Sequence, residues 1–181
     1  MSKDTVITQL RDLFRQYGYE GTSLSKISEA TGLGRASLYH YFPKGKEEMA
    51  LAVLDRVYAE LEENLLKPLK GKGKPIIRVR AMGKTLEQFY NGGQSSCFVD
   101  LLSIGEAQPL FQTPIRQTLT ALLDALTQVL LEAGQEPKLA QQRAEDALIQ
   151  IQGALVLSRC LGNTEPFQRA IAKLPETLGL E

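Results

Sequence analysis

The chain has 181 residues, of which 43% are hydrophobic and 23% charged, and its 21 basic and 21 acidic side chains cancel. This composition is ordinary for a globular protein, and the length suits one generous domain or two small ones. The opening MSKDTVITQL has no secretory pattern, and no apolar run is long enough to span a bilayer. We therefore expect a cytoplasmic protein with no membrane partner, and its two cysteines predict no disulfide framework.

In the first part of the chain, apolar residues recur at helical spacing and strand patterns are missing. Ser23 is a suitable N-cap and Gly32 a suitable end for the second helix, and Pro43 ends the third. The segment KPLKGKGKP, residues 67–75, has no apolar period and predicts a mobile connection. The helices expected in this part are 6–17, 24–31, 34–41 and 47–66.

The second part of the chain also reads as helical. Pro114 and Pro137 stand where helices are expected to begin, and Gly134 and Gly162 where they are expected to end. The expected helices are 77–90, 98–102, 114–133, 137–161 and 166–173. The predicted fold is all-α: an N-terminal three-helix domain over residues 1–47 and a larger helical domain over 48–181, joined by the connecting helix 47–66.

The two short helices around Thr31-Gly32-Leu33-Gly34 have the proportions of a helix-turn-helix, whose second helix enters the DNA major groove. Between Leu33 and Lys46 there are three basic residues and no acidic one, so this part of a neutral chain is locally positive. The positions expected to face inward are Ile27, Ala30, Leu33 and Leu38. Those expected to face outward, as hydrogen-bond donors to phosphates or base edges, are Arg35, Ser37, Tyr39 and His40.

The stretch YGYEGTSLSKISEATGLGRASLYHYFPKGKEEM resembles the N-terminal DNA-binding domain of TetR-family transcriptional regulators. The resemblance covers roughly residues 5–55 and rests on many ordered matches, among them Gly21-Thr22-Ser23, Gly32-Leu33, Leu38-Tyr39 and Lys46-Glu47-Glu48. It implies a dimeric repressor that binds a double-stranded DNA operator and releases it when a small molecule binds the C-terminal domain.

The resemblance also implies roles for particular residues. Arg35, Ala36 and Ser37 fall where the recognition helix approaches base edges, and Tyr39 and Lys46 fall on positions that touch phosphate. Two departures stand beside these matches. Ser28 replaces a common alanine, and the segment Pro43-Lys44-Gly45 is about one residue longer than the common pattern, which affects where Lys46 lies. The full expected DNA-binding set is Ser23, Arg35, Ala36, Ser37, Tyr39, His40 and Lys46.

His40 has no nucleophile or carboxylate in its own segment that would make it a general base. One histidine and two separated cysteines make no recognisable metal site. We therefore expect no enzyme activity, catalytic residue, metal or cofactor, and interpret Tyr41 and Phe42 as packing residues. The lysines of residues 67–75, with Arg78 and Arg80, would either attract DNA nonspecifically or form a solvated connection, and the second interpretation is favoured.

An apolar or aromatic effector is the expected ligand of the C-terminal domain, bound by Phe89, Phe98, Leu102, Phe111, Leu122, Leu126 and Gln152. At helical spacing, each of these residues fits a core better than a pocket. Cys97 is expected at a helix N-terminus, where the dipole favours a reactive thiolate, so a redox- or electrophile-sensing repressor is an alternative. A small buried packing residue is the other interpretation of Cys97.

The two long C-terminal helices carry the expectation of a homodimer. In the family that the chain resembles, such helices pair with their symmetry mates, and a two-fold dimer matches a palindromic operator. The small residues Ala140, Ala147, Gly153 and Ala154 would permit close approach of helices, although the same residues would also fill a monomer core. An activator, a regulator without a ligand and a helical scaffold without DNA binding remain open.

Overall fold

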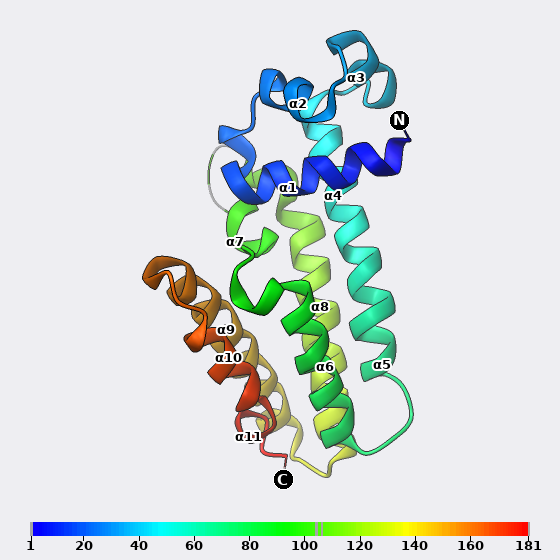
Figure 1. Ribbon diagram of the computed structural model, residues 1–181. Helices are drawn as coiled ribbons and strands as arrows, with labels where there is room; N and C mark the ends of the chain where they lie inside the picture. The colour runs from blue at the N-terminus through cyan, green and yellow to red at the C-terminus, as the bar shows by residue number, and fades with distance from the viewer. Residues whose placement is uncertain (1, 104, 106, 181) are drawn as a thin grey trace. The chain divides into compact units, whose positions relative to one another are not determined.

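The computed structural model describes residues 2–103, 105 and 107–180, and every regular element within them is a helix (Figure 1). This confirms the all-α prediction. Contacts divide the chain into two compact units: Met1–Ala59 with Phe98–Ile115, and Glu60–Cys97 with Arg116–Glu181. The division differs from the expected boundary at 47/48 because α7 and the start of α8 pack against α1. In the described part of the chain, no helix combines the length and the apolar character needed to cross a membrane.

The first unit contains α1 (Lys3–Gly21), α2 (Leu24–Thr31), α3 (Arg35–Tyr41), most of α4 (Lys46–Leu61), α7 (Phe98–Leu102) and the start of α8 (Gln108–Glu132). The expected caps of α2 are confirmed. The Ser23 hydroxyl accepts a hydrogen bond from the Lys26 N–H at 3.2 Å, and Gly32 ends the helix with φ at +66°. These caps fix where α2 begins and where the turn to α3 starts.

The core of the first unit holds α2 and α3 by their apolar sides. Ile27, Leu38 and Phe42 are fully buried, as expected. The prediction that Ala30 faces inward is wrong, because Thr31 lies one turn after Ile27 and takes the buried place. The Thr31 hydroxyl donates to the Ile27 carbonyl at 2.7 Å and accepts from the Leu33 N–H at 3.3 Å, so its burial leaves no unpaired hydroxyl.

In the second unit, the helix begun by α4 continues as a π-helix, Glu62–Leu66, and then as α5 (Lys67–Leu69). Residues 67–69 of the expected connection are therefore helical, and the non-helical segment starts at residue 70. The wider π turn is held by the Thr85 hydroxyl, which donates to the Asn64 carbonyl at 3.2 Å. The remaining elements are α6 (Pro75–Phe89), a 3₁₀ turn (Asn91–Gly93), the rest of α8, α9 (Pro137–Leu161), α10 (Glu165–Ala172) and α11 (Leu174–Thr177).

The positions of the prolines predicted the start of α9 correctly, but they predicted the start of α8 and the end of the last helix wrongly. Pro137 begins α9, and Gly162 ends it with φ at +61°, as expected. Pro114 lies inside α8, which starts six residues earlier, at Gln108. The helix continues past Pro114 although a proline cannot donate to the carbonyl of Leu110. Pro175 lies within the further helix α11 instead of following the last helix.

Arg78 anchors the turn that joins α5 to α6. It is 6% exposed, and one guanidinium nitrogen donates to the carbonyls of Leu69 at 2.7 Å and Gly71 at 3.0 Å. The other terminal nitrogen forms a hydrogen-bonded ion pair with Glu132 of α8. This hydrogen bond holds the pKa of Glu132 below its usual value, with a smaller effect from Gln128. Arg78 is therefore a structural residue and not part of an exposed basic run.

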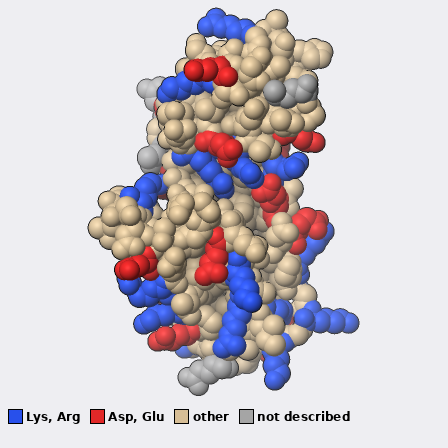
Figure 2. Space-filling view, in the orientation of Figure 1, with Lys and Arg blue, Asp and Glu red and all other residues tan. Residues whose placement is uncertain are grey.

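Packing of α9 against α10 dominates the rest of the second unit, and the two helices lie side by side in Figure 1. The Ser158 hydroxyl of α9 accepts from the Phe167 N–H at 3.2 Å, which secures the first turn of α10. Gly93 allows Phe167 to pack against the 3₁₀ turn, because a Cβ at Gly93 would lie 2.8 Å from the Phe167 Cβ. Basic and acidic side chains are interspersed over the face shown in Figure 2.

Candidate nucleic-acid interface

The turn between α2 and α3 is held by hydrogen bonds from both sides. The Ser28 hydroxyl donates to the Leu33 carbonyl at 2.6 Å, and the Gln9 side-chain amide of α1 donates to the Ala30 carbonyl at 3.2 Å. Ser28 is one of the two departures from the family pattern, and it contributes a tie across the turn that alanine cannot make. The turn is thus fixed by local bonds that do not use the outward face of α3.

The outward face of α3 carries the side chains that the sequence predicted. Arg35, Ala36, Ser37 and His40 are exposed, and Tyr39 is 45% exposed. Leu38 and, just after the helix, Phe42 point into the core and fix the rotation of α3. A helix anchored on one face by buried apolar groups presents the other face in a defined orientation. This arrangement suits groups that read base edges and phosphates.

Gly45 explains the longer segment between α3 and α4. Its φ is +67°, its N–H donates to the Phe42 carbonyl at 2.8 Å, and a Cβ there would lie 3.4 Å from the Tyr39 ring. The extra residue is therefore closed into a turn beneath Tyr39 by a conformation that glycine adopts readily. The turn supports the Tyr39 ring from below, while the ring stays exposed.

Lys46 and Lys44 have different surroundings. The Lys46 ammonium donates to the Tyr19 carbonyl at 3.1 Å and lies 4.2 Å from the centre of the Tyr19 ring. Lys44 is exposed, and in the described part of the chain its ammonium has no hydrogen-bond or ion-pair partner. Of the two lysines, the sequence analysis expected only Lys46 to contact phosphate. Lys44 is a second candidate, because its ammonium is exposed and has no partner among the described residues.

Tyr19 links this region to the segment 98–115. Its ring stacks on Phe14 with centroids 6.0 Å apart and meets the edge of Phe111 at 5.1 Å. Burial raises the pKa of Tyr19, and the carboxylates of Glu47 and Glu20 raise it further, so the phenol stays neutral at physiological pH. The pair Gly18-Tyr19 belongs to the family resemblance, but the sequence analysis assigned Tyr19 no role, because its contacts depend on the kink that Gly18 makes in α1 with φ at +68°.

The residues expected to line an effector pocket are spread over both units. Phe98, Leu102 and Phe111 belong to the first unit, and Phe89, Leu122, Leu126 and Gln152 to the second. Four of them, Phe98, Leu102, Phe111 and Leu126, are buried. The expected pocket therefore stays a prediction.

Cys97 lies immediately before α7 and is 5% exposed. The Tyr90 hydroxyl donates to its sulfur at 3.3 Å, and the Gln152 amide donates at 3.5 Å. Cys160 is exposed on α9. Across residues 2–103, 105 and 107–180, no group of three or more His, Cys, Asp and Glu side chains is placed to hold a metal ion.

Two family models match the chain in sequence. The model described as bacterial regulatory proteins of the tetR family matches residues 6–53, and the model for the C-terminal domain of LmrA/YxaF-like transcriptional regulators matches residues 75–173. The HTH-type transcriptional regulator LmrA of Bacillus subtilis is 24% identical over 186 residues, which cover 98% of this chain and 96% of that protein. The HTH-type transcriptional regulator RutR of Escherichia coli is 36% identical over 55 residues, covering 30% of this chain and 26% of that protein.

Solved structures share the fold over nearly the whole chain. A TetR transcriptional regulator from Legionella pneumophila superposes with a TM-score of 0.85 at 17% identity, covering 98% of this chain and 97% of that one. The reduced form of NemR from Escherichia coli superposes with a TM-score of 0.78 at 22% identity, covering 96% and 95% of the two chains. At these identities the likeness concerns the fold.

Replacing Lys44 or Lys46 with glutamine distinguishes a lysine that binds DNA from a lysine that stabilises the fold. We expect Lys44→Gln to weaken binding to all DNA sequences and to reduce the slope of log K against log salt by about 1, with no change in unfolding. Lys46→Gln should lower the free energy of unfolding by about 1 kcal/mol, because the Tyr19 carbonyl loses a charged donor. Fluorescence anisotropy and urea unfolding measure both quantities. A reduced salt slope with unchanged unfolding for Lys46→Gln would contradict this assignment.

Proposed function

Because the chain belongs to the TetR family of bacterial transcriptional regulators, we propose that it represses transcription as a dimer on a palindromic operator and that a small apolar or aromatic effector releases it. The observation that carries the proposal is the exposed, acid-free face of α3, which buried Leu38 and Phe42 hold in one orientation. Arg35 would read base edges, while Tyr39, Lys44 and Ser23 would position the domain on the phosphates.

The outer face of α9 supports the dimer. An apolar stripe runs along the last three turns of this helix, with Ile149 at 70% and Leu157 at 53% exposure. Gly153 lies in the stripe, and no atom lies within 4 Å of the place a Cβ would take. The residues of the stripe are Ile149, Gly153, Val156, Leu157, Cys160 and Leu161. Most of the α9 residues that the sequence analysis named for assembly, including Ala147 and Ala154, are buried within the chain instead.

An apolar face of this kind loses its contact with water when a second copy covers it, which stabilises an association. A glycine at its centre lets two helix backbones approach closely. In a two-fold dimer, the two recognition helices would address half-sites one helical turn of DNA apart, roughly 34 Å.

Release of DNA is proposed as a shift between two states, of which the effector binds the one whose recognition helices are badly spaced. α4 would transmit the change, because it is part of the connecting helix that joins the two expected domains. The contacts of Tyr19 with Phe111 and Lys46 give a second route within the first unit, from the segment 98–115 to the start of α4.

Binding to DNA from upstream of its own gene tests the proposal, with fluorescence anisotropy as the measurement and random DNA as competitor. We expect tight, salt-sensitive and sequence-selective binding, and a loss of about 1–3 kcal/mol in Arg35→Ala through the lost base contact. The circular dichroism of Arg35→Ala should match that of the wild type.

Equal affinity of Arg35→Ala and the wild type on every sequence would favour a helical scaffold without specific DNA binding. A reporter gene behind the operator then separates the remaining alternatives. Repression supports the proposal. Activation would contradict the role as a repressor, and repression that no apolar or aromatic compound relieves would contradict the proposed effector.

The dimer is tested by Gly153→Leu. The added side chain has open space in one chain, so we expect unchanged or slightly higher thermal stability of the monomer fold, since glycine lowers helix stability by about 0.5–1 kcal/mol relative to alanine. It would fill the space that a partner helix needs. Analytical ultracentrifugation should show a monomer, and operator affinity should fall. Arg169 is exposed on α10 and lies outside the stripe, so Arg169→Leu is the matched control and should remain dimeric. A dimeric Gly153→Leu would refute this interface.

A second candidate function is thiol sensing through Cys97, which the two donors to its sulfur, Tyr90 and Gln152, favour. We expect N-ethylmaleimide to lower operator affinity in the wild type and in Cys160→Ser, and to leave Cys97→Ser unaffected. Mass spectrometry shows which thiol has reacted. Full operator affinity after complete alkylation of Cys97 would leave this residue with a packing role only.

A further inference from the structure

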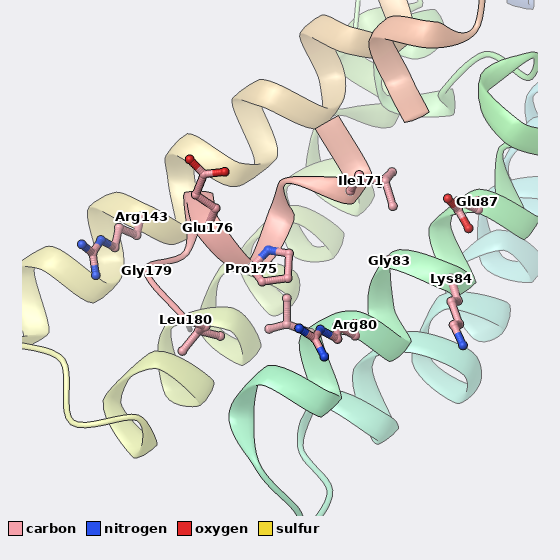
Figure 3. A pocket seen from close by; sticks show the side chains of 12 residues that line it. Arg80, Gly83, Lys84, Glu87, Arg143, Ile171, Pro175, Glu176, Gly179 and Leu180 are labelled. Atoms are coloured by element: carbon pink, nitrogen blue, oxygen red, sulfur yellow. The ribbon is translucent and has the colours of Figure 1, made fainter. Parts of the chain in front are cut away.

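The second unit contains a hollow of about 650 Å³, and its lining includes none of the residues expected to bind an effector. Residues of α6, α9, α10 and α11 and the last residues of the chain line it (Figure 3). Its size is within the range of small-molecule sites, which are typically 300–1,000 Å³. All of its lining belongs to one compact unit, so its shape does not depend on how the two units are placed.

Three cationic side chains line the hollow. Arg80 and Lys84 lie one turn apart on α6, and Arg143 comes from α9. In Figure 3, Arg80 extends toward Leu180 and Pro175. Among residues 2–103, 105 and 107–180, none of the three cations has an ion pair or a side-chain hydrogen bond. This distinguishes them from Arg78, Lys46 and Lys26, whose charged groups all have partners within the protein.

Arg143 lies at the edge of the hollow, beside the last described residues. Its guanidinium lies against the backbone of Gly179, where φ is +65°, and any Cβ at that position would overlap it. Planar guanidinium groups bind carboxylate and sulfonate oxygens in a fixed geometry.

The wall between the cations is apolar and close-packed. Val79, Ile171 and Leu180 are buried, and Gly83 brings the α6 backbone against Ile171, since a Cβ at Gly83 would lie 3.2 Å from the Ile171 Cγ2 atom. Glu87 and Glu176 also line the hollow, so the lining carries three positive and two negative charges. This balance suits a single negative charge and disfavours a polyanion such as DNA.

We propose that this hollow is a binding site for a small amphiphile with one anionic group and an apolar, ring-sized body. The anionic group would bind Arg80, which extends toward Leu180 and Pro175 (Figure 3), and the apolar body would cover Val79, Ile171 and Leu180. The site would act without DNA and does not depend on the proposed repressor function.

A pair of matched probes tests this proposal in the absence of DNA. 1-Anilinonaphthalene-8-sulfonate carries one sulfonate, and N-phenyl-1-naphthylamine has the same rings without a charge. We expect the sulfonate probe to bind one site per chain, seen as a saturable rise in fluorescence. Arg80→Gln should weaken it about tenfold, because it removes a charged hydrogen bond, and Arg143→Gln should have a smaller effect. The uncharged probe should bind much more weakly and respond to neither substitution.

Arg169→Gln is the matched control, because Arg169 is exposed on α10 outside the hollow, and this variant should bind the sulfonate probe as the wild type does. Gly153→Leu separates the hollow from the apolar stripe of α9 and should also leave the affinity for this probe unchanged. The proposal is overturned by no saturable binding, by equal affinity for the two probes, or by unaltered affinity in Arg80→Gln. Thermal unfolding of each variant confirms that it is folded.

Discussion

Tyr19 is the residue on which the arrangement of the DNA-binding unit depends. Gly18 turns the end of α1 with φ at +68° and ψ at −179°, a conformation that would cost other residues about 1–3 kcal/mol. The turn brings the Tyr19 ring between Phe14 and Phe111 and offers its carbonyl to Lys46 at the start of α4. The ends of α1, the start of α4 and the segment 98–115 therefore meet at one residue. α3 precedes α4 by a short turn, so its position follows from the same contacts.

The basic residues divide into two groups that a net charge of zero conceals. Arg78 and Lys46 bond to backbone carbonyls and hold turns or helix ends together. Arg35, Lys44 and the three cations of the hollow have exposed or lining positions and no partner among the described residues. The charges of the second group can bind a ligand without breaking a contact within the protein. Removing one of the first group instead leaves a polar backbone group without its donor, which is a loss of stability.

Local chemistry explains why much of the fold could be predicted from the sequence. Ser23, Gly32, Pro137 and Gly162 act through the backbone of one helix end, so their roles are visible in a short stretch of sequence. The face of α3 was predictable for the same reason, because Leu38 and Arg35 differ in polarity and stand at defined positions on one helix.

The errors come from contacts between distant residues. The segment after Leu66 stays helical because Arg78, nine residues after Leu69, bonds the carbonyl of that residue. Lys46 bonds the carbonyl of Tyr19, which lies 27 residues earlier, and its spacing in the sequence did not reveal this contact. The hollow joins residues from 79 to 180, and no local pattern marks it.

The α9 stripe and the hollow occupy different parts of one helix, and this determines whether both can be used at once. Arg143 stands six residues before Ile149, so roughly 9 Å of helix separates it from the start of the stripe. The stripe then runs toward Leu161, away from Arg143 and from the chain end that forms the hollow wall. A partner helix centred on Gly153 would therefore leave the lining of the hollow uncovered. On this geometry, assembly and binding of an anionic amphiphile do not compete for the same surface.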